Sequence, residues 1–220
     1  MDFTIFSMTH LGTLGLIVFI SVFIFRFRYQ LDERFRYFLG FLMLSLELGY
    51  HAWAVLMGQW SIAYSLPFQL CSMSIMLCLI LIFTEARWAY EIVYFTGLGG
   101  ASMALITPDL FYDFPHFRFF HFFINHAAIL WTIFYFTWTK GYRPTYRSLW
   151  KTIGYLNIYM ILIYGLNMLV GGNYLFLIEK PAAGSLLDVM GPHPWYILSL
   201  EGVTILLFHL LYLPHPRRKA

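Results

Sequence analysis

Charged side chains are scarce in this sequence. Asp, Glu, Lys and Arg make up 11% of its 220 residues, whereas 60% of the residues are hydrophobic. Because a soluble domain carries about 25% charged residues, this composition excludes an ordinary soluble domain and indicates an integral membrane protein. The formal charge of +3 does not predict a nucleic-acid partner, since the basic residues lie in short segments between apolar runs.

Cysteine is also nearly absent. The only two, Cys71 and Cys78, are seven residues apart in one apolar run. In a helix they share a face and lie about 10 Å apart, which is too far for a disulfide. Both thiols are therefore predicted to be free. Cys78, with Leu77 and Leu79 on either side, is interpreted as a structural side chain.

Several catalytic and cofactor motifs are missing. The last apolar run contains no lysine, which excludes a retinal Schiff base, and the sequence has neither Gly-x-Ser-x-Gly nor His-Glu-x-x-His. We expect no metal and no cofactor.

Seven apolar runs come close to the roughly 20 residues that span a membrane. They predict an all-α, polytopic membrane protein with seven transmembrane helices in a single domain over residues 1–220. Because Met1-Asp2-Phe3 has no Lys or Arg, we expect no signal peptide and a retained first helix. The expected helices span about 6–25, 37–57, 66–83, 88–106, 119–139, 151–170 and 194–213.

The basic residues are distributed unequally between the two predicted sides. Of the 14 Lys and Arg residues, only Arg118 and Lys180 fall on one side. The positive-inside rule then places the N-terminus outside and the C-terminus in the cytoplasm, in a multi-pass protein of the cell membrane. The other twelve are Arg26, Arg28, Arg34, Arg36, Arg87, Lys140, Arg143, Arg147, Lys151, Arg217, Arg218 and Lys219.

Polar side chains inside the predicted helices gather between the outer boundary and the midplane. Intramembrane ionisable groups are costly and usually face a bundle interior or a wet cavity. We therefore expect one polar cavity open to the outer side, with Asn173 and Tyr174 beside it at the end of the sixth helix. The intramembrane residues of this set are Glu47, His51, Cys71, Asn125, His126, Asn167 and Glu201.

Cys71 and His126 fall at the same predicted depth, roughly 8–10 Å below the outer boundary. A buried free cysteine is most often a small hydrophobe, and a membrane histidine often only bonds a neighbouring helix. The functional interpretation makes His126 the general base that forms the Cys71 thiolate and then protonates a leaving group. The residues alone leave both interpretations open.

Other polar groups allow two interpretations as well. Glu47 and His51, one turn apart, form either a satisfied pair or a proton relay. Glu201 and Asn167 either pack helices together or line the cavity. The outer loop from Asp109 to His121 is interpreted as interfacial polarity, with a metal or lipid headgroup as the alternative, and its spacing fits no zinc template.

Three motifs resemble the signatures of the YwaF-type bacterial integral membrane proteins. LPFQLC at residues 66–71 resembles the first signature. FPHFRFF at 114–120, followed by His126, resembles the second, and GNYLFL at 172–177 with Lys180-Pro181 resembles the third. The motifs occur in the family's order and span most of the chain.

This resemblance implies a lipid enzyme. Animal relatives look like polytopic acyltransferases that load polyunsaturated acyl chains into ether phospholipids, and more distant relatives are hydrolases of fatty-acid esters of hydroxy fatty acids. In the acyltransferases the signature cysteine and the histidine of the later helix are taken as the catalytic pair, which here are Cys71 and His126. The resemblance thus implies an acyltransferase or transacylase that forms a thioester on Cys71, with membrane lipids as acyl donor and acceptor.

Two alternatives stay open. With water as the acceptor, the same dyad makes a lipid-ester hydrolase. A transporter or receptor without enzymatic activity would instead use Glu47, His51 and Glu201 to bind its substrate or carry protons. Such a protein would tolerate loss of the Cys71 thiol and fail on loss of the carboxylates. The sequence does not predict an oligomeric state.

Overall fold

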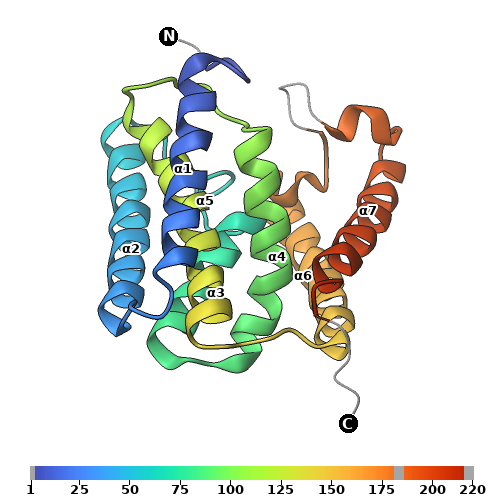
Figure 1. The fold of residues 1–220 in the computed structure, drawn as a ribbon. Helices are drawn as coiled ribbons and strands as arrows, with labels where there is room; N and C mark the ends of the chain where they lie inside the picture. The colour runs from blue at the N-terminus through green and yellow to red at the C-terminus, as the bar shows by residue number, and fades with distance from the viewer. Residues whose placement is uncertain (1–2, 181–185, 216–220) are drawn as a thin grey trace.

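The structure, a computed structural model, describes residues 3–180 and 186–215, and within them it is all-α, without a β-strand (Figure 1). Some predictions concern residues outside this part of the chain. They are the start at Met1-Asp2, which has no Lys or Arg, Pro181 of the third motif, and the basic residues Arg217, Arg218 and Lys219.

The observed helices follow the predicted runs within a few residues. Six of them, all except the 15-residue α3, are long and apolar enough to cross a membrane. The chain is therefore a multi-pass membrane protein, while its count of seven spans and its orientation remain predictions. Within the described residues, the seven α-helices are α1 (Met8–Arg26), α2 (Glu33–Leu56), α3 (Leu70–Thr84), α4 (Arg87–Ile106), α5 (Phe117–Phe134), α6 (Tyr146–Val170) and α7 (Trp195–Tyr212). A π-helical turn, η1 (Tyr135–Thr139), continues α5. Two short 3-10 helices, η2 (Tyr174–Phe176) and η3 (Leu186–Met190), lie between α6 and α7.

Successive long helices run in opposite directions, so the bundle has two chemically different ends (Figure 1). We call the end that carries the α1–α2, α3–α4 and α5–α6 connections the basic end, because nine Lys or Arg residues lie in or beside these connections. At the opposite end, the motif end, α3 and α5 begin and the α6–α7 connection lies. Arg118 and Lys180 are at the motif end.

Polar side chains fix the first turns of several helices. Ser7 accepts a hydrogen bond from the His10 N–H at the start of α1, and Asp32 accepts one from the Arg34 N–H at the start of α2. Thr145 and Ser148 form a reciprocal capping box at the start of α6. Each of these bonds satisfies a first-turn N–H that has no partner within its helix.

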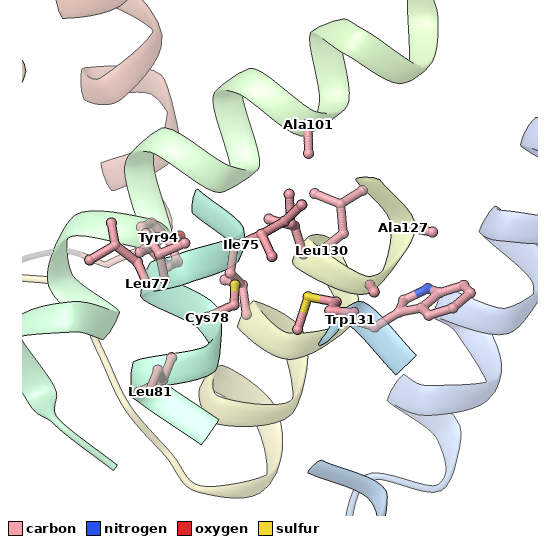
Figure 2. Close-up of a cluster of buried hydrophobic side chains, with 14 of the residues drawn as sticks. Ile75, Leu77, Cys78, Leu81, Tyr94, Ala101, Ala127, Leu130 and Trp131 are labelled. Carbon is pink, nitrogen blue, oxygen red and sulfur yellow. The ribbon is translucent and has the colours of Figure 1, made fainter. Parts of the chain in front are cut away.

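Helices α3, α4 and α5 form the core of the bundle (Figure 1). In the α5 segment 67% of the most apolar window is buried, against 11% in α6 and α7, so the last two helices present most of their surface to lipid. Figure 2 shows the core side chains: Ile75, Leu77, Cys78 and Leu81 from α3 meet Tyr94 and Ala101 from α4 and Ala127, Leu130 and Trp131 from α5.

Two glycines of α4 let its neighbours approach closely. A Cβ atom at Gly97 would lie 2.7 Å from Ile133 and 2.8 Å from Ile129 of α5. A Cβ atom at Gly100 would lie 3.2 Å from Leu70 and 3.9 Å from the Cys71 sulfur of α3. Small residues at helix interfaces permit such approach in membrane bundles, and here they bring the start of α3 against α4.

A charge network holds the basic end together. Glu85, which follows α3 in a left-handed conformation (φ 53°), pairs with Arg36 of α2 and lies 3.2 Å from the Lys140 ammonium group after η1. Lys140 also reaches Glu33 at 3.1 Å. Partial burial disfavours the Glu85 charge, but Lys140 and Arg36 outweigh it and hold the pKa of Glu85 below its ordinary value.

The start of α3 differs from the prediction. Pro67 was expected in the first helical turn, but α3 begins only at Leu70. The Phe68 N–H instead bonds the Leu66 carbonyl at 2.8 Å, which makes a γ-turn centred on Pro67. Tyr159 of α6 donates to the Phe68 carbonyl at 3.0 Å, and Tyr174 of η2 accepts from the Leu66 N–H at 2.9 Å. Tertiary contacts thus replace the predicted helical turn.

Candidate active site

The first and third sequence motifs touch each other at the motif end. The hydroxyl of Tyr174 accepts a hydrogen bond from the Leu66 N–H at 2.9 Å and donates one to the Ile62 carbonyl at 2.7 Å. The Gln69 amide oxygen accepts the Leu175 N–H at 3.0 Å. GNYLFL thus fixes the approach of the chain to α3, immediately before Cys71.

The connection that carries this contact is itself rigidly bonded. The Asn167 amide bonds both backbone groups of Tyr174, at 2.9 and 2.8 Å. Asn173 bonds the backbone of Ile178 and Glu179 at 3.1, 3.3 and 2.8 Å. A Cβ atom at Gly172 would lie 2.6 Å from the Ala63 carbonyl oxygen. Asn167 and Asn173 were predicted to bind substrate, but in this structure their polar atoms bond the backbone and so position it.

Cys71 is the second residue of α3, closer to the helix start than predicted. Met73 is the first residue of α3 to donate a helical hydrogen bond, to the Gln69 carbonyl at 2.9 Å. Among the described residues, none accepts a hydrogen bond from the N–H groups of Leu70, Cys71 or Ser72. Unpaired first-turn amides and the helix dipole stabilise negative charge, so the helix start offsets part of the cost of forming a thiolate at Cys71 in apolar surroundings.

The ring of His126 is oriented by its own helix. Its Nδ1 atom lies 2.6 Å from the Phe122 carbonyl oxygen, and the Phe122 ring packs 4.2 Å away, centroid to centroid. Because a carbonyl only accepts hydrogen bonds, Nδ1 carries the proton of the neutral ring. The Nε2 atom then has a free lone pair, as a general base requires.

One structural measure compares the heights of Cys71 and His126 along the bundle. Glu85 and Lys140, which follow α3 and η1, are in contact at the basic end. Cys71 precedes Glu85 by fourteen residues, and His126 precedes Lys140 by fourteen residues. Since both helices run towards the basic end, both side chains lie about 21 Å from it.

The glycines of α4 give a second, separate measure. Gly97 faces Ile129 and Ile133 of α5, and Gly100 faces Leu70 and Cys71 of α3. Gly100 is three residues nearer the motif end than Gly97. This places Cys71 level with the turn of α5 that begins at His126, within about one helical turn, 5.4 Å. No hydrogen bond joins Cys71 to His126 in this structure.

A second polar cluster lies between α2 and α5. Asn125 donates to Glu47 at 3.1 Å and lies 3.2 Å from His121, whose other nitrogen accepts from Arg118 at 3.1 Å. The Asn125 amide oxygen is buried without a partner among the described residues. Because the Asn125 amide already donates to Glu47, the first-turn amides of α3 are the better oxyanion donors.

The remaining predicted polar residues are paired elsewhere, so the structure does not gather them around one cavity. His51 accepts from the Trp60 indole at 3.2 Å, and among the described residues no hydrogen bond joins it to Glu47, so the paired arrangement, one of the two that the sequence left open, is not seen. Glu201 of α7 accepts from Asn157 of α6 at 3.0 Å. The two groups are separate because His51 is bonded from the connection that follows α2, whereas Glu201 is bonded across the α6–α7 contact.

Two cavities lie at other places in the bundle. An apolar groove of about 430 Å³ runs between α1, α4 and α5, with Ser21 and Ser102 as the only hydroxyl side chains in its wall. A smaller cavity of about 240 Å³ lies at the motif end beside Arg118. Within the described residues no three His, Cys, Asp or Glu side chains form a group that would hold a metal ion.

A comparison with protein families gives a match that covers nearly the whole chain. Residues 5–212 match the model of the TMEM164 family. The chain belongs to the TMEM164 family. No curated protein and no solved structure matches the sequence. The matched range contains all three motifs, whereas the YwaF-type naming of the resemblance remains a prediction.

Sequence analysis named Tyr174 and Asn167 as candidate site residues, but it missed other residues that the structure brings into hydrogen-bonded contact. Gln69 was seen only as a motif letter, and Asn157 was not singled out. His121 was assigned to interfacial polarity, although its spacing of four residues from Asn125 places both on one helix face. That spacing was the one available signal.

Proposed function

We propose that this member of the TMEM164 family is a membrane-embedded lipid acyltransferase or transacylase, with Cys71 as nucleophile and His126 as general base. Family membership supports this class of reaction, since the animal ether-phospholipid acyltransferases belong to the same family. The observation that carries the assignment is the position of Cys71 in the first turn of α3, where unpaired amides favour both a thiolate and an oxyanion.

The first half-reaction transfers an acyl group to the enzyme. His126 Nε2 takes the proton of the Cys71 thiol, and the sulfur attacks the carbonyl carbon of a phospholipid ester. A C–S bond forms, the C–O bond breaks, and His126 returns the proton to the departing lysolipid oxygen. The N–H groups of Leu70, Cys71 and Ser72 are the donors available for the tetrahedral oxyanion.

The second half-reaction releases the acyl group to an acceptor. His126 removes the proton of the acceptor hydroxyl, whose oxygen attacks the thioester. The new C–O bond forms as the C–S bond breaks, and the proton on His126 returns to the Cys71 sulfur. With water as acceptor the same steps are hydrolysis, so acyl transfer and hydrolysis differ only in which hydroxyl reaches the thioester.

The structure favours this assignment over a transporter. That alternative needs Glu47, His51 and Glu201 to act on one substrate, but the three are bonded separately, to Asn125, Trp60 and Asn157. Cys71 and His126, in contrast, occupy one level of two packed helices.

Acyl transfer between defined lipids tests the proposal. Purified protein in detergent receives a phospholipid donor with isotope-labelled acyl chains and an unlabelled lysophospholipid acceptor, and the products are measured by mass spectrometry. We expect transfer with the wild type and with Cys78→Ala, none with Cys71→Ala, and a loss of about 10²-fold or more with His126→Gln. Equal transfer by Cys71→Ala would overturn the proposal, and labelled free fatty acid as sole product would assign hydrolysis.

A further inference from the structure

The smaller cavity at the motif end contains a cation without an acidic partner. Its wall is formed by Tyr50, Trp53, Ala54, Gln59, Phe111, Tyr112 and Arg118, and none of these is acidic. Its volume of about 240 Å³ exceeds the roughly 30 Å³ share of one water molecule several times. The cavity therefore has room for a polar group larger than a single water.

The Arg118 guanidinium group is held in place by aromatic rings. It lies 4.4 Å from the centroid of Tyr50 and 5.7 Å from that of Trp53. Tyr50 in turn stacks on His121 with centroids 5.1 Å apart. Stacking on aromatic faces orients a guanidinium group without using its N–H donors.

Most donors of Arg118 are unused. A guanidinium group has five N–H donors, and among the described residues the Arg118 side chain makes one hydrogen bond, from Nη1 to His121 at 3.1 Å. Among the described residues it forms no ion pair with a carboxylate. The nearby Glu47 is bonded by Asn125 and lies 3.7 Å from His121, which stands between it and Arg118.

The acidic residue nearest to Arg118 in the sequence, Asp113, already has a hydrogen-bond partner. Asp113 accepts the Phe114 N–H at 2.7 Å and is not part of the cavity wall. Gln59 and Tyr112 add side-chain donors to the same wall. A fixed, planar cation with free donors in a cavity that lacks acids is suited to a phosphate group, which accepts paired N–H bonds.

We infer that this cavity binds the phosphate group of a glycerophospholipid, with Arg118 as its principal ligand. The inference rests on the proposed function in one respect, namely that the bound lipid is the substrate whose ester reaches Cys71. Arg118 lies in the first turn of α5, at the same end of the bundle at which Cys71 lies in the first turn of α3. A phosphate held there leaves the acyl chains free to extend into the membrane.

Lipid binding measured by native mass spectrometry tests the site without turnover. The probes are dioleoylphosphatidic acid and dioleoylglycerol, which have the same chains with and without phosphate. We expect Arg118→Gln to weaken phosphatidic acid binding about tenfold or more and to leave dioleoylglycerol binding unchanged. Lys180→Gln, which removes the other cation of the motif end, should leave the binding of both lipids unchanged. Arg118→Lys keeps the positive charge but loses the paired N–H donors of the guanidinium group, so its phosphatidic acid binding should lie between those of the wild type and Arg118→Gln.

The outcomes separate this inference from the proposed function. Unchanged phosphatidic acid binding by Arg118→Gln, an equal loss of dioleoylglycerol binding, or an equal effect of Lys180→Gln would overturn the inference. Glycerol 3-phosphate distinguishes the source: displacement of the lipid shows a site that also takes soluble phosphate, and no displacement shows one confined to lipid phosphate. If Cys71→Ala binds normally and the wild type never transfers an acyl group, the proposed function fails while the phosphate site stands.

Discussion

The Tyr174 hydroxyl and the Leu66 N–H are hydrogen-bonded at 2.9 Å, across 108 residues of chain. This bond joins the turn that follows α6 to the turn that precedes α3. It holds the turn immediately before α3, which begins at Leu70 and has Cys71 in its first turn. The polar atoms of this connection therefore act on the candidate nucleophile through backbone position.

Tyr174→Phe tests this positioning. The variant leaves the Leu66 N–H and the Ile62 carbonyl without their partner, so we expect the unfolding free energy to fall by about 1–3 kcal/mol and acyl transfer to fall with it. The control is Tyr94→Phe, which removes a hydroxyl bonded to the Leu211 carbonyl at 3.1 Å near the basic end. If both variants lose the same transfer activity at equal thermal stability, Tyr174 has no special link to Cys71.

Gly172→Ala tests the close contact between the motifs. Its Cβ would lie 2.6 Å from the Ala63 oxygen, whereas nothing lies within 4 Å of a Cβ at Gly165 in α6. We expect Gly172→Ala to lower the melting temperature in detergent. Gly165→Ala should leave the melting temperature unchanged or raise it, because Ala is favoured over Gly inside a helix by about 1 kcal/mol. A Gly172→Ala protein as stable as the wild type would show that the two turns separate easily.

The charge network at the basic end predicts a pH dependence. The pKa of Glu85 is held below its ordinary value near 4.5 and that of Lys140 is raised above 10.5. The stabilising contribution of Glu85 is thus complete above its unfolded-state pKa, and it is lost as the pH falls through its lower folded-state pKa. The contribution of Lys140 is complete below its unfolded-state pKa of about 10.5, and it is lost as the pH rises through its higher folded-state pKa. Glu85→Gln should lower stability at pH 7 by about 1 kcal/mol and flatten the acid limb of a melting-temperature profile, and an unchanged acid limb would contradict this.

The two thiols are expected to react at different rates. Cys71 is partly exposed, whereas Cys78 is fully buried in the α3–α5 core. N-ethylmaleimide should therefore alkylate the folded protein at Cys71 first, and peptide mass spectrometry identifies the site. Preferential labelling of Cys78 would show that the start of α3 is more tightly closed than the structure has it.

The helices could be predicted from the sequence because the membrane imposes one pattern on all of them. Runs of apolar residues near 20 long, broken by charges and glycines, predicted all seven helix starts within about five residues. The start of α3 was placed four residues early, since the γ-turn at Pro67 depends on Tyr174, a contact that local sequence does not encode. Propensity favoured a helical proline, and a long-range hydrogen bond prevailed.

The candidate site was less predictable than the helices. Many polar residues have similar predicted depths in the membrane, but only a few of them contact one another. Cys71 and His126 were selected at equal predicted depth, and their heights along α3 and α5 agree within about one helical turn, while their pairing stays a prediction. The same criterion also selected His51, Glu201 and Asn167, which the structure pairs with Trp60, Asn157 and Tyr174. A depth estimate made for each helix separately does not give the rotation of that helix about its own axis. This rotation decides towards which neighbour a polar side chain points.

The central claim is that the Cys71 sulfur carries the acyl group. Intact-protein mass spectrometry after incubation with mixed-chain phospholipids tests it most directly, with wild type, Cys71→Ala, Cys71→Ser and Cys78→Ala side by side. We predict that wild type and Cys78→Ala gain the mass of one acyl chain, that hydroxylamine removes it, and that peptide mapping places it on Cys71. A folded wild type that gains no acyl mass from any donor, or a Cys71→Ala protein that gains the same mass, would contradict the account.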